Sequence, residues 1–183
     1  MTTTDHELMR RAAEDDARAF GLLAERWEAR TAAVLRRLAP AAEVDDLRQE
    51  VFLRVWRAAG RYRPRAAFST WLFRIVINVA RDAARRRRKW EPLPEDAVVG
   101  GDSPRERCEQ REIRALVAES LASLPDAQRV ILVLKHYADL TFAQAADVLG
   151  LPVSTVKSRL ATGLLQLRAE LARRGIQPEE TKT

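Results

Sequence analysis

The amino-acid sequence predicts an all-α protein made of two small helical domains joined by a flexible linker, the C-terminal domain containing a helix-turn-helix. Ala, Leu, Arg, Glu and Lys make up 99 of the 183 residues, whereas Gly and Pro together contribute 15. This composition favours helices over a β sandwich or barrel. Apolar residues also recur every three or four positions along most of the chain, which is the helical period. The longest interruption of that period lies between two segments that are each long enough to bury a modest core.

The interruption sets the predicted domain boundaries. Prolines and glycines cluster in Trp90-Glu-Pro-Leu-Pro94 and in Gly100-Gly-Asp-Ser-Pro104, and the residues between them show no helical period. An unstructured linker of this length would span about 50 Å when taut, so we expect tethered rather than fused domains. The predicted boundaries are a first domain over 1–89, a linker over 90–104, a second domain over 105–175 and a tail over 176–183.

Several classes of protein are excluded by what the sequence lacks. The longest stretch without a charged residue is nine, Val148–Val156, where a membrane-spanning helix needs about 18 to 20. The first five residues do not resemble a secretory signal, so we expect a cytoplasmic protein. Cys108 is the only cysteine, and His6 and His136 are the only histidines, too few for a structural zinc site or an intrachain disulfide. We therefore predict no metal and no cofactor.

The sequence also lacks the residue patterns of common catalytic sites. It shows no paired acids framed by metal ligands, no Gly-rich phosphate loop and no nucleophile with a neighbouring base. We therefore predict neither an enzymatic activity nor a small-molecule substrate.

The positive charge is concentrated in one segment. The net charge is +6, but residues 61–89 hold ten basic side chains and one acidic one, and the segments on either side are close to neutral. Such a local excess indicates a binding site for a polyanion, and nucleic acid before a membrane lipid. A solvated basic face is the alternative.

Two helical stretches are expected before this segment, from about residue 5 to 38 and from 43 to 59, separated by Ala39-Pro40. In the second stretch Phe52 and Trp56 form an aromatic pair, four residues apart, that is either core or an exposed ridge for a partner. Apolar residues on another face recur every three or four positions and are expected to be buried: Val44, Leu47, Val51 and Val55.

Within the basic segment the sequence predicts a helix that begins near Ser69 or Thr70, either of which can cap it. One face is apolar and is expected to be buried, with Leu72, Ile75, Val76, Val79 and Ala83. The opposite face lies within an arc of about 80° and carries Arg74, Asn78, Arg81, Arg85 and Arg88. The run Arg85–Lys89, which includes Arg86, extends this polar face.

Two uncharged residues of this helix have distinct expected roles. The Asn78 amide suits a base edge better than a phosphate, because it carries both a donor and an acceptor and no charge. Trp71 borders the apolar face, and we favour a core position for it over the alternative, a platform on which an unstacked base could lie.

The C-terminal segment carries a helix-turn-helix pattern after helices predicted over 105–123 and 125–137. Thr141–Leu149 is the first helix of the motif, Gly150 supplies the turn, and the second helix begins near Val153. Ala146 allows close approach, and Val156 and Leu160 anchor the second helix. In this arrangement the start of the second helix faces a DNA major groove with Ser154, Thr155, Lys157, Ser158 and Arg159. Simple capping of the helix by Ser154 or Thr155 is the alternative role for those two residues.

Four segments, in this order, resemble bacterial RNA polymerase sigma factors of the extracytoplasmic-function (ECF) type of the sigma-70 family. They are Asp45–Trp56, Phe68–Asn78, Leu124–Arg129 and Leu149–Arg159. The resemblance implies a protein that binds core RNA polymerase and directs promoter-specific initiation through −10 and −35 elements. It implies two conserved helical domains, called regions 2 and 4, and the partners core polymerase (β′ clamp helices and β subunit), promoter DNA and an inhibitory anti-sigma protein.

The same resemblance assigns the candidate site residues. The surface for the β′ clamp helices would hold Asp46, Gln49, Glu50, Phe52, Leu53 and Trp56. The −10 element would be bound by Arg74, Asn78, Arg81, Arg85, Arg86 and Arg88. The −35 element would be bound by Ser154, Thr155, Lys157, Ser158 and Arg159.

The chain departs from the family pattern in two places near the −35 residues. Ala161-Thr-Gly163 replaces more basic residues, and Gly163 costs a helix roughly 1 kcal/mol relative to Ala. Gln144 replaces a common acidic residue. The alternative function is a stand-alone helix-turn-helix regulator, which would leave the helix over 45–56 and the basic segment unexplained.

Overall fold

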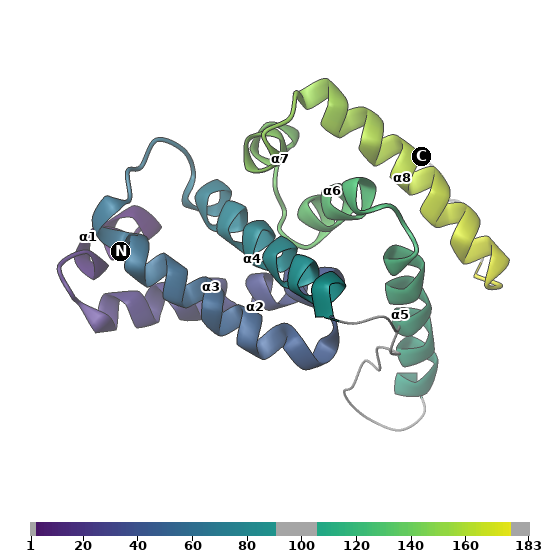
Figure 1. Cartoon of the computed structure of the whole chain (residues 1–183), viewed down its shortest axis with the longest axis horizontal. Coiled ribbons are helices and arrows are strands. Elements are labelled where there is room, and N and C mark those ends of the chain that lie inside the picture. Colours follow the sequence, from purple (N-terminus) through teal and green to yellow (C-terminus); the bar gives the residue numbers. More distant parts are fainter. Residues whose placement is uncertain (1–2, 91–105, 177–183) are drawn as a thin grey trace.

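The structure is a computed structural model that describes residues 3–90 and 106–176. Those residues form eight α-helices and no strand, so the predicted all-α class with two helical domains is confirmed (Figure 1). The first group holds α1 (Asp5–Ala12), α2 (Ala17–Leu38), α3 (Val44–Ala58) and α4 (Phe68–Trp90), with short 3-10 helices η1 (Ala41–Glu43) and η2 (Ala59–Arg61). The second holds α5 (Glu106–Ala122), α6 (Asp126–His136), α7 (Phe142–Leu149) and α8 (Val153–Arg173).

The single helical stretch expected up to residue 38 is divided into α1 and α2. Asp15 has a left-handed backbone with φ of 60°, which a helix cannot contain. Asp16 then caps α2, accepting a hydrogen bond from the Ala19 amide at 2.9 Å and pairing with Arg11 at 2.6 Å. The division lets α1 fold back against α2.

The predicted apolar faces of the first group form its core. All four stripe residues of α3 are buried, and so are Leu72, Val76, Val79 and Ala83 of α4, while Ile75 is half-buried. The expected cap at Ser69 or Thr70 was wrong, because α4 begins at Phe68 and the Ala67 carbonyl accepts from the Thr70 amide at 3.0 Å. Thr70 is instead buried.

Gln144 and Gly163, one residue from each family departure, have structural roles in the second group. Gln144 completes a capping box on α7, in which its backbone amide donates to Thr141 Oγ1 at 3.2 Å and its side-chain oxygen accepts from the Thr141 amide at 2.8 Å. Gly163 lies where α8 packs on α6, and a Cβ there would stand 3.2 Å from Gln128 Cβ and from Leu132 Cδ1. Gly150 ends α7 in the left-handed conformation expected of the turn, with φ of 65°.

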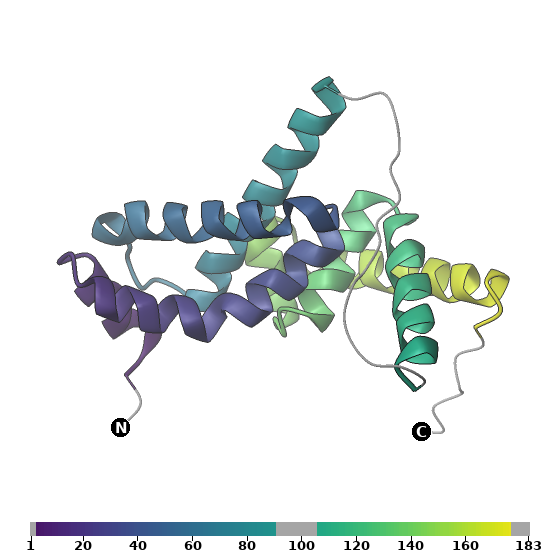
Figure 2. The same ribbon diagram turned by 90° about the horizontal axis from the view of Figure 1, so that it is seen from below.

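The two groups of helices touch each other. α7 packs against α4, and α2 contacts α5 and α6 (Figure 1). Arg37 of α2 lies 4.7 Å from the centre of the Tyr137 ring, and Arg30 lies 4.0 Å from the Asp139 carboxylate. The end of α4 extends past the other described helices in Figure 2, while Ala80 and Ala83 earlier in the helix are buried. None of the described helices is long and apolar enough to cross a bilayer.

Candidate nucleic-acid interface and partner groove

A groove of about 790 Å³ runs between α2 and α3. The α3 side of the groove is lined by all six residues predicted for the polymerase surface: Asp46, Gln49, Glu50, Phe52, Leu53 and Trp56. Phe52 and Trp56 are half-buried and pack on the core while also facing the groove, so the structure combines the two alternatives posed for this pair. Leu53 is 42% exposed. Exposed apolar surface of this kind favours a protein partner.

The other wall of the groove comes from α2 and was not predicted from the sequence. Phe20 meets the edge of the Trp56 ring at 4.9 Å between centroids, which joins the two walls. The signal that could have identified this wall is a set of residues at helical spacing on one face of α2: Phe20, Gly21, Ala24, Glu25 and Glu28. The lining thus combines apolar side chains with more acids than bases, because Glu25, Glu28, Asp46 and Glu50 outnumber Arg48. Such a surface suits a helix with apolar and basic side chains.

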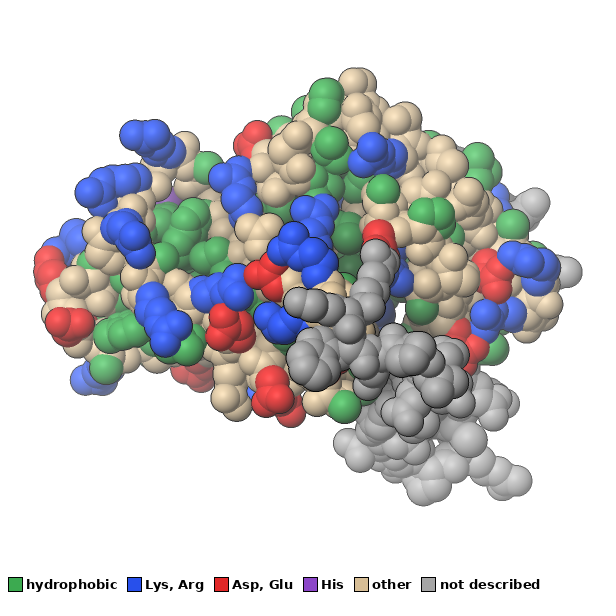
Figure 3. Space-filling model, viewed as in Figure 1, with side chains coloured by type: hydrophobic (Ala, Val, Ile, Leu, Met, Phe, Trp, Pro, Cys, Tyr) green, Lys and Arg blue, Asp and Glu red, His purple; other side chains and the backbone are tan. Residues whose placement is uncertain are grey.

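The polar face of α4 is exposed where the sequence predicted it. Arg74, Asn78, Arg81, Arg85 and Arg86 are exposed, and the Arg88 side chain lies outside the described residues. Figure 3 shows several Lys and Arg side chains gathered over the first group of helices. Arg87 lies on another side of α4, where it forms an ion pair with Glu43 at 2.6 Å.

One acid lowers the positive charge of this basic face. Asp82 pairs with Arg85 and, at 3.1 Å, with Arg54 of α3. Burial raises the pKa of Asp82, but the hydrogen bonds from Arg85 and Arg54 outweigh burial and hold that pKa below its ordinary value. Asp82 is therefore ionised at neutral pH and offsets part of the positive charge near Arg85.

Arg74 makes a contact that the sequence did not predict. Its guanidinium donates a hydrogen bond at 2.6 Å to the backbone oxygen of Asp147, in the last turn of α7. The last carbonyls of a helix lack intrahelical partners and carry partial negative charge, so an arginine there caps the helix. The polar face of α4 is thus joined to the first helix of the helix-turn-helix.

The loop between η2 and α4, with the last residue of η2, adds three exposed arginines, Arg61, Arg63 and Arg65, that the sequence analysis did not single out. Their alternation with Tyr62 and Pro64 inside the basic segment was the available signal. Trp71 is half-buried next to this loop, in edge contact with Tyr62 at 4.9 Å, and it packs against the core. This placement agrees with the core position favoured for Trp71.

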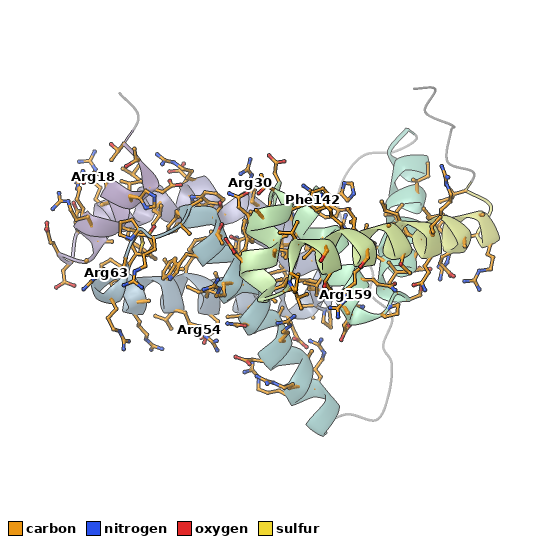
Figure 4. The ribbon with its side chains drawn as sticks, turned by 90° about the horizontal axis from the view of Figure 1, so that it is seen from above. Arg18, Arg30, Arg54, Arg63, Phe142 and Arg159 are labelled. Carbon is orange, nitrogen blue, oxygen red and sulfur yellow. The ribbon has the colours of Figure 1, made fainter. Side chains whose placement is uncertain are left out.

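The start of α8 presents the residues predicted for the −35 element. Ser154, Lys157 and Ser158 are exposed, whereas Thr155 and Arg159 are half-buried; Figure 4 labels Arg159 of α8 and Phe142 of α7. The Lys157 ammonium lies 5.6 Å from the centre of the Phe142 ring. Pro152 precedes the helix without a side-chain cap bond, so the alternative that Ser154 or Thr155 caps α8 was wrong.

Among the described residues no group of three His, Cys, Asp or Glu side chains could hold a metal ion.

Comparison with known proteins identifies the class and then the family. The Sigma-70 region 2 model matches residues 23–90, and the Sigma-70 region 4 model matches residues 114–167, the two regions of a sigma-70-type factor in their expected order. The ECF RNA polymerase sigma-E factor of Escherichia coli K12 is 31% identical over 169 residues, covering 86% of this chain and 88% of that protein. The protein with the same name from Haemophilus influenzae is 30% identical, covering 86% and 89%. The chain belongs to the ECF sigma factors of the sigma-70 family.

Two solved structures are similar to the whole arrangement. CnrH in complex with the cytosolic domain of CnrY matches with a TM-score of 0.73 and 30% identity, covering 92% of this chain and 97% of that one. The sigma factor RpoE in complex with the anti-sigma factor NepR from Bartonella quintana matches with a TM-score of 0.67 and 19% identity, covering 78% and 89%. The second likeness supports the fold alone.

Proposed function

We propose that this chain is a promoter-specificity subunit that binds core RNA polymerase and directs initiation at promoters with −10 and −35 elements. The observation that carries the proposal is the α2–α3 groove, because six residues chosen from the sequence line one continuous surface there. Exposed apolar lining of this kind marks a protein-binding surface, which a subunit of the polymerase needs. The groove would receive the β′ clamp helices, and the β subunit would be a further contact.

The two DNA contacts are assigned to α4 and α8. The exposed polar face of α4 and the arginine loop before it would bind and open the −10 element, with Asn78 on a base edge and the arginines on phosphates. Ser154, Lys157 and Ser158 at the start of α8 would enter the major groove at the −35 element. Opening a duplex costs a few kcal/mol for each unstacked step, which is consistent with a protein that acts only together with the polymerase.

Three further properties follow from the family and belong to the same proposal. The chain catalyses no covalent step of its own and works in the cytoplasm. We infer that an anti-sigma protein is its inhibitor; the complex of the sigma factor RpoE with the anti-sigma factor NepR is an example of such a pairing for that protein.

Run-off transcription tests the proposal. Core polymerase is given fragments of the source genome with and without this chain, and discrete new start sites that share two upstream sequence blocks are expected only with it.

Replacing Gln49 and Glu50 together by Ala is expected to lower the affinity for core polymerase. The matched control is Asp45→Ala, an exposed carboxylate on the same helix that does not line the groove. Specific duplex binding without any binding to core polymerase would instead support the stand-alone regulator.

A further inference from the structure

Helix α1 lies outside the residues that the region 2 model matches, yet it contacts the loop that leads into α4. α1 packs on α2 and on η2, and a cavity of about 450 Å³ separates it from residues 59–64. Figure 1 shows α1 beside the end of α3 from which this loop departs, and Figure 4 labels Arg63 of the loop at the same end of the molecule. α1 is therefore placed to influence the loop.

One hydrogen bond joins α1 to the loop. His6 Nδ1 lies 2.6 Å from Tyr62 Oη, and the two rings stack at 5.8 Å between centroids with an interplanar angle of 21°. Burial, with the nearby charge of Asp5, raises the pKa of Tyr62 to about 12, so its hydroxyl keeps its proton at neutral pH. The hydroxyl and Nδ1 are within hydrogen-bond distance, and the tautomer of the imidazole sets which of the two donates. The bond links residues 56 positions apart.

Tyr62 in turn holds the two ends of the loop together. Its ring meets Trp71 edge-on at 4.9 Å and Phe68 at 6.0 Å between centroids. Since Tyr62 is the first residue of the loop and Phe68 begins α4, the segment 63–67 is closed by this aromatic contact. The exposed arginines Arg63 and Arg65 lie on that closed segment. Their position therefore depends on where the Tyr62 ring lies.

α1 provides a fixed support for His6. Leu8, Met9 and Ala12 on its inner face are buried, at 2% exposure or less. Asp5 pairs with Arg26 of α2 at 2.5 Å, and Thr4 caps the start of the helix. A side chain held by a packed helix orients its neighbour better than one on a free terminus.

We propose that His6 is a positioning residue for −10 recognition, which holds Tyr62 and thereby the loop carrying Arg63 and Arg65 in the orientation that meets promoter DNA. The inference rests on the proposed function of α4 and its preceding loop. His6 does not touch the DNA. It restricts the loop to fewer orientations before DNA binds, so the loop loses less conformational entropy on binding. This is the physical basis of preorganisation.

The first experiment measures loop positioning without polymerase or DNA. The rate of trypsin cleavage after Arg65 is measured by mass spectrometry on the full chain. The variants are His6→Ala and Tyr62→Phe, and the control is Glu14→Ala, at an exposed residue just after α1. Cleavage of a folded protein tracks local opening. We expect about fivefold faster cleavage for the first two variants, as loss of one hydrogen bond would give, and no change for the control. Unchanged cleavage in His6→Ala would overturn the proposal.

The second experiment measures promoter opening at a start site found by run-off transcription. His6→Ala and Tyr62→Phe are each expected to slow opening about fivefold, with affinity for core polymerase within twofold and −35 preference unchanged. The double variant should be no slower than either single one, because both remove the same bond. His6→Asn, which keeps a polar atom near the Nδ1 position, should restore most of the rate.

The outcomes separate the inference from the proposed function. If the wild-type chain gives no −10-dependent start site, the proposed function is refuted, and so is the role of His6 in −10 recognition. The trypsin experiment still shows in that case whether His6 positions the loop. Normal starts with wild type and an unchanged rate in His6→Ala refute the inference alone. Equal losses of core affinity, −35 preference and opening in His6→Ala would show a general folding role and would also overturn it.

Discussion

Gly163 shows how one residue can look unfavourable in the sequence and be required by the structure. Glycine weakens a helix by roughly 1 kcal/mol relative to Ala, yet here α8 packs on α6 at the point where a Cβ would meet Gln128 and Leu132 at 3.2 Å. Leu132 is itself only 2% exposed, so it has little room to move away. The absence of a side chain is therefore what lets the two helices approach.

This contact predicts opposite effects for two substitutions of the same kind. Gly163→Ala is expected to lower the free energy of unfolding by about 1 kcal/mol, because overpacking outweighs the gain in helix propensity. Gly21→Ala is the matched control, since Gly21 also lies inside a helix but an added Cβ there would have nothing within 4 Å; it is expected to raise that free energy by up to about 1 kcal/mol. Urea unfolding followed by circular dichroism measures both. A stabilising Gly163→Ala would contradict the account of the α6–α8 contact.

Different residues of helix α3 contribute to the stability of the fold and to the proposed partner surface. Val51 is completely buried in the core, whereas Leu53, two residues further on, is 42% exposed in the α2–α3 groove. The helix therefore uses one face for folding and another for the proposed contact with polymerase. The two functions can be tested independently on one element.

We expect Val51→Ala to lower the free energy of unfolding by about 2 kcal/mol. Leu53→Ala should change that free energy by no more than about 0.5 kcal/mol while weakening the affinity for core polymerase about tenfold, as loss of an apolar anchor does. Thermal unfolding and a fluorescence titration of core polymerase give the two quantities. If Leu53→Ala bound core polymerase like the wild-type chain, the groove would not be the polymerase surface.

The helix faces could be predicted from the sequence because helical periodicity is local. The stripe Val44, Leu47, Val51 and Val55 is buried as expected, and the Gly150 turn has the expected backbone. The second wall of the groove, with Phe20, could not be predicted in this way, because which face of α2 meets α3 is decided by packing between distant elements. The contact of Arg74 with Asp147 depends on tertiary structure in the same sense.

In the arrangement of the whole molecule, the two groups of helices lie too close together for both proposed DNA contacts to form at once. α7 packs on α4, and the Arg74 guanidinium is bound to the Asp147 carbonyl at 2.6 Å. The same guanidinium is assigned to the −10 element, and α7 lies against it in this arrangement. In addition, elements two duplex turns apart are separated by about 70 Å, farther than helices in direct contact can reach. The two groups of helices must therefore separate when both elements are bound.

A covalent bridge between the groups tests this consequence. In a Cys108→Ser background, Arg74→Cys and Asp147→Cys are joined by a bismaleimide, and the same variant treated with N-ethylmaleimide is the control that carries both substitutions without the bridge. The bridged chain is expected to bind core polymerase through the α2–α3 groove but to give at least about tenfold fewer transcripts than the control, because α8 is then held beside α4 and cannot reach the −35 element. Transcript counts and the affinity for core polymerase are measured on both preparations. Equal transcript yields from the bridged and control proteins would mean that this arrangement already suits promoter binding.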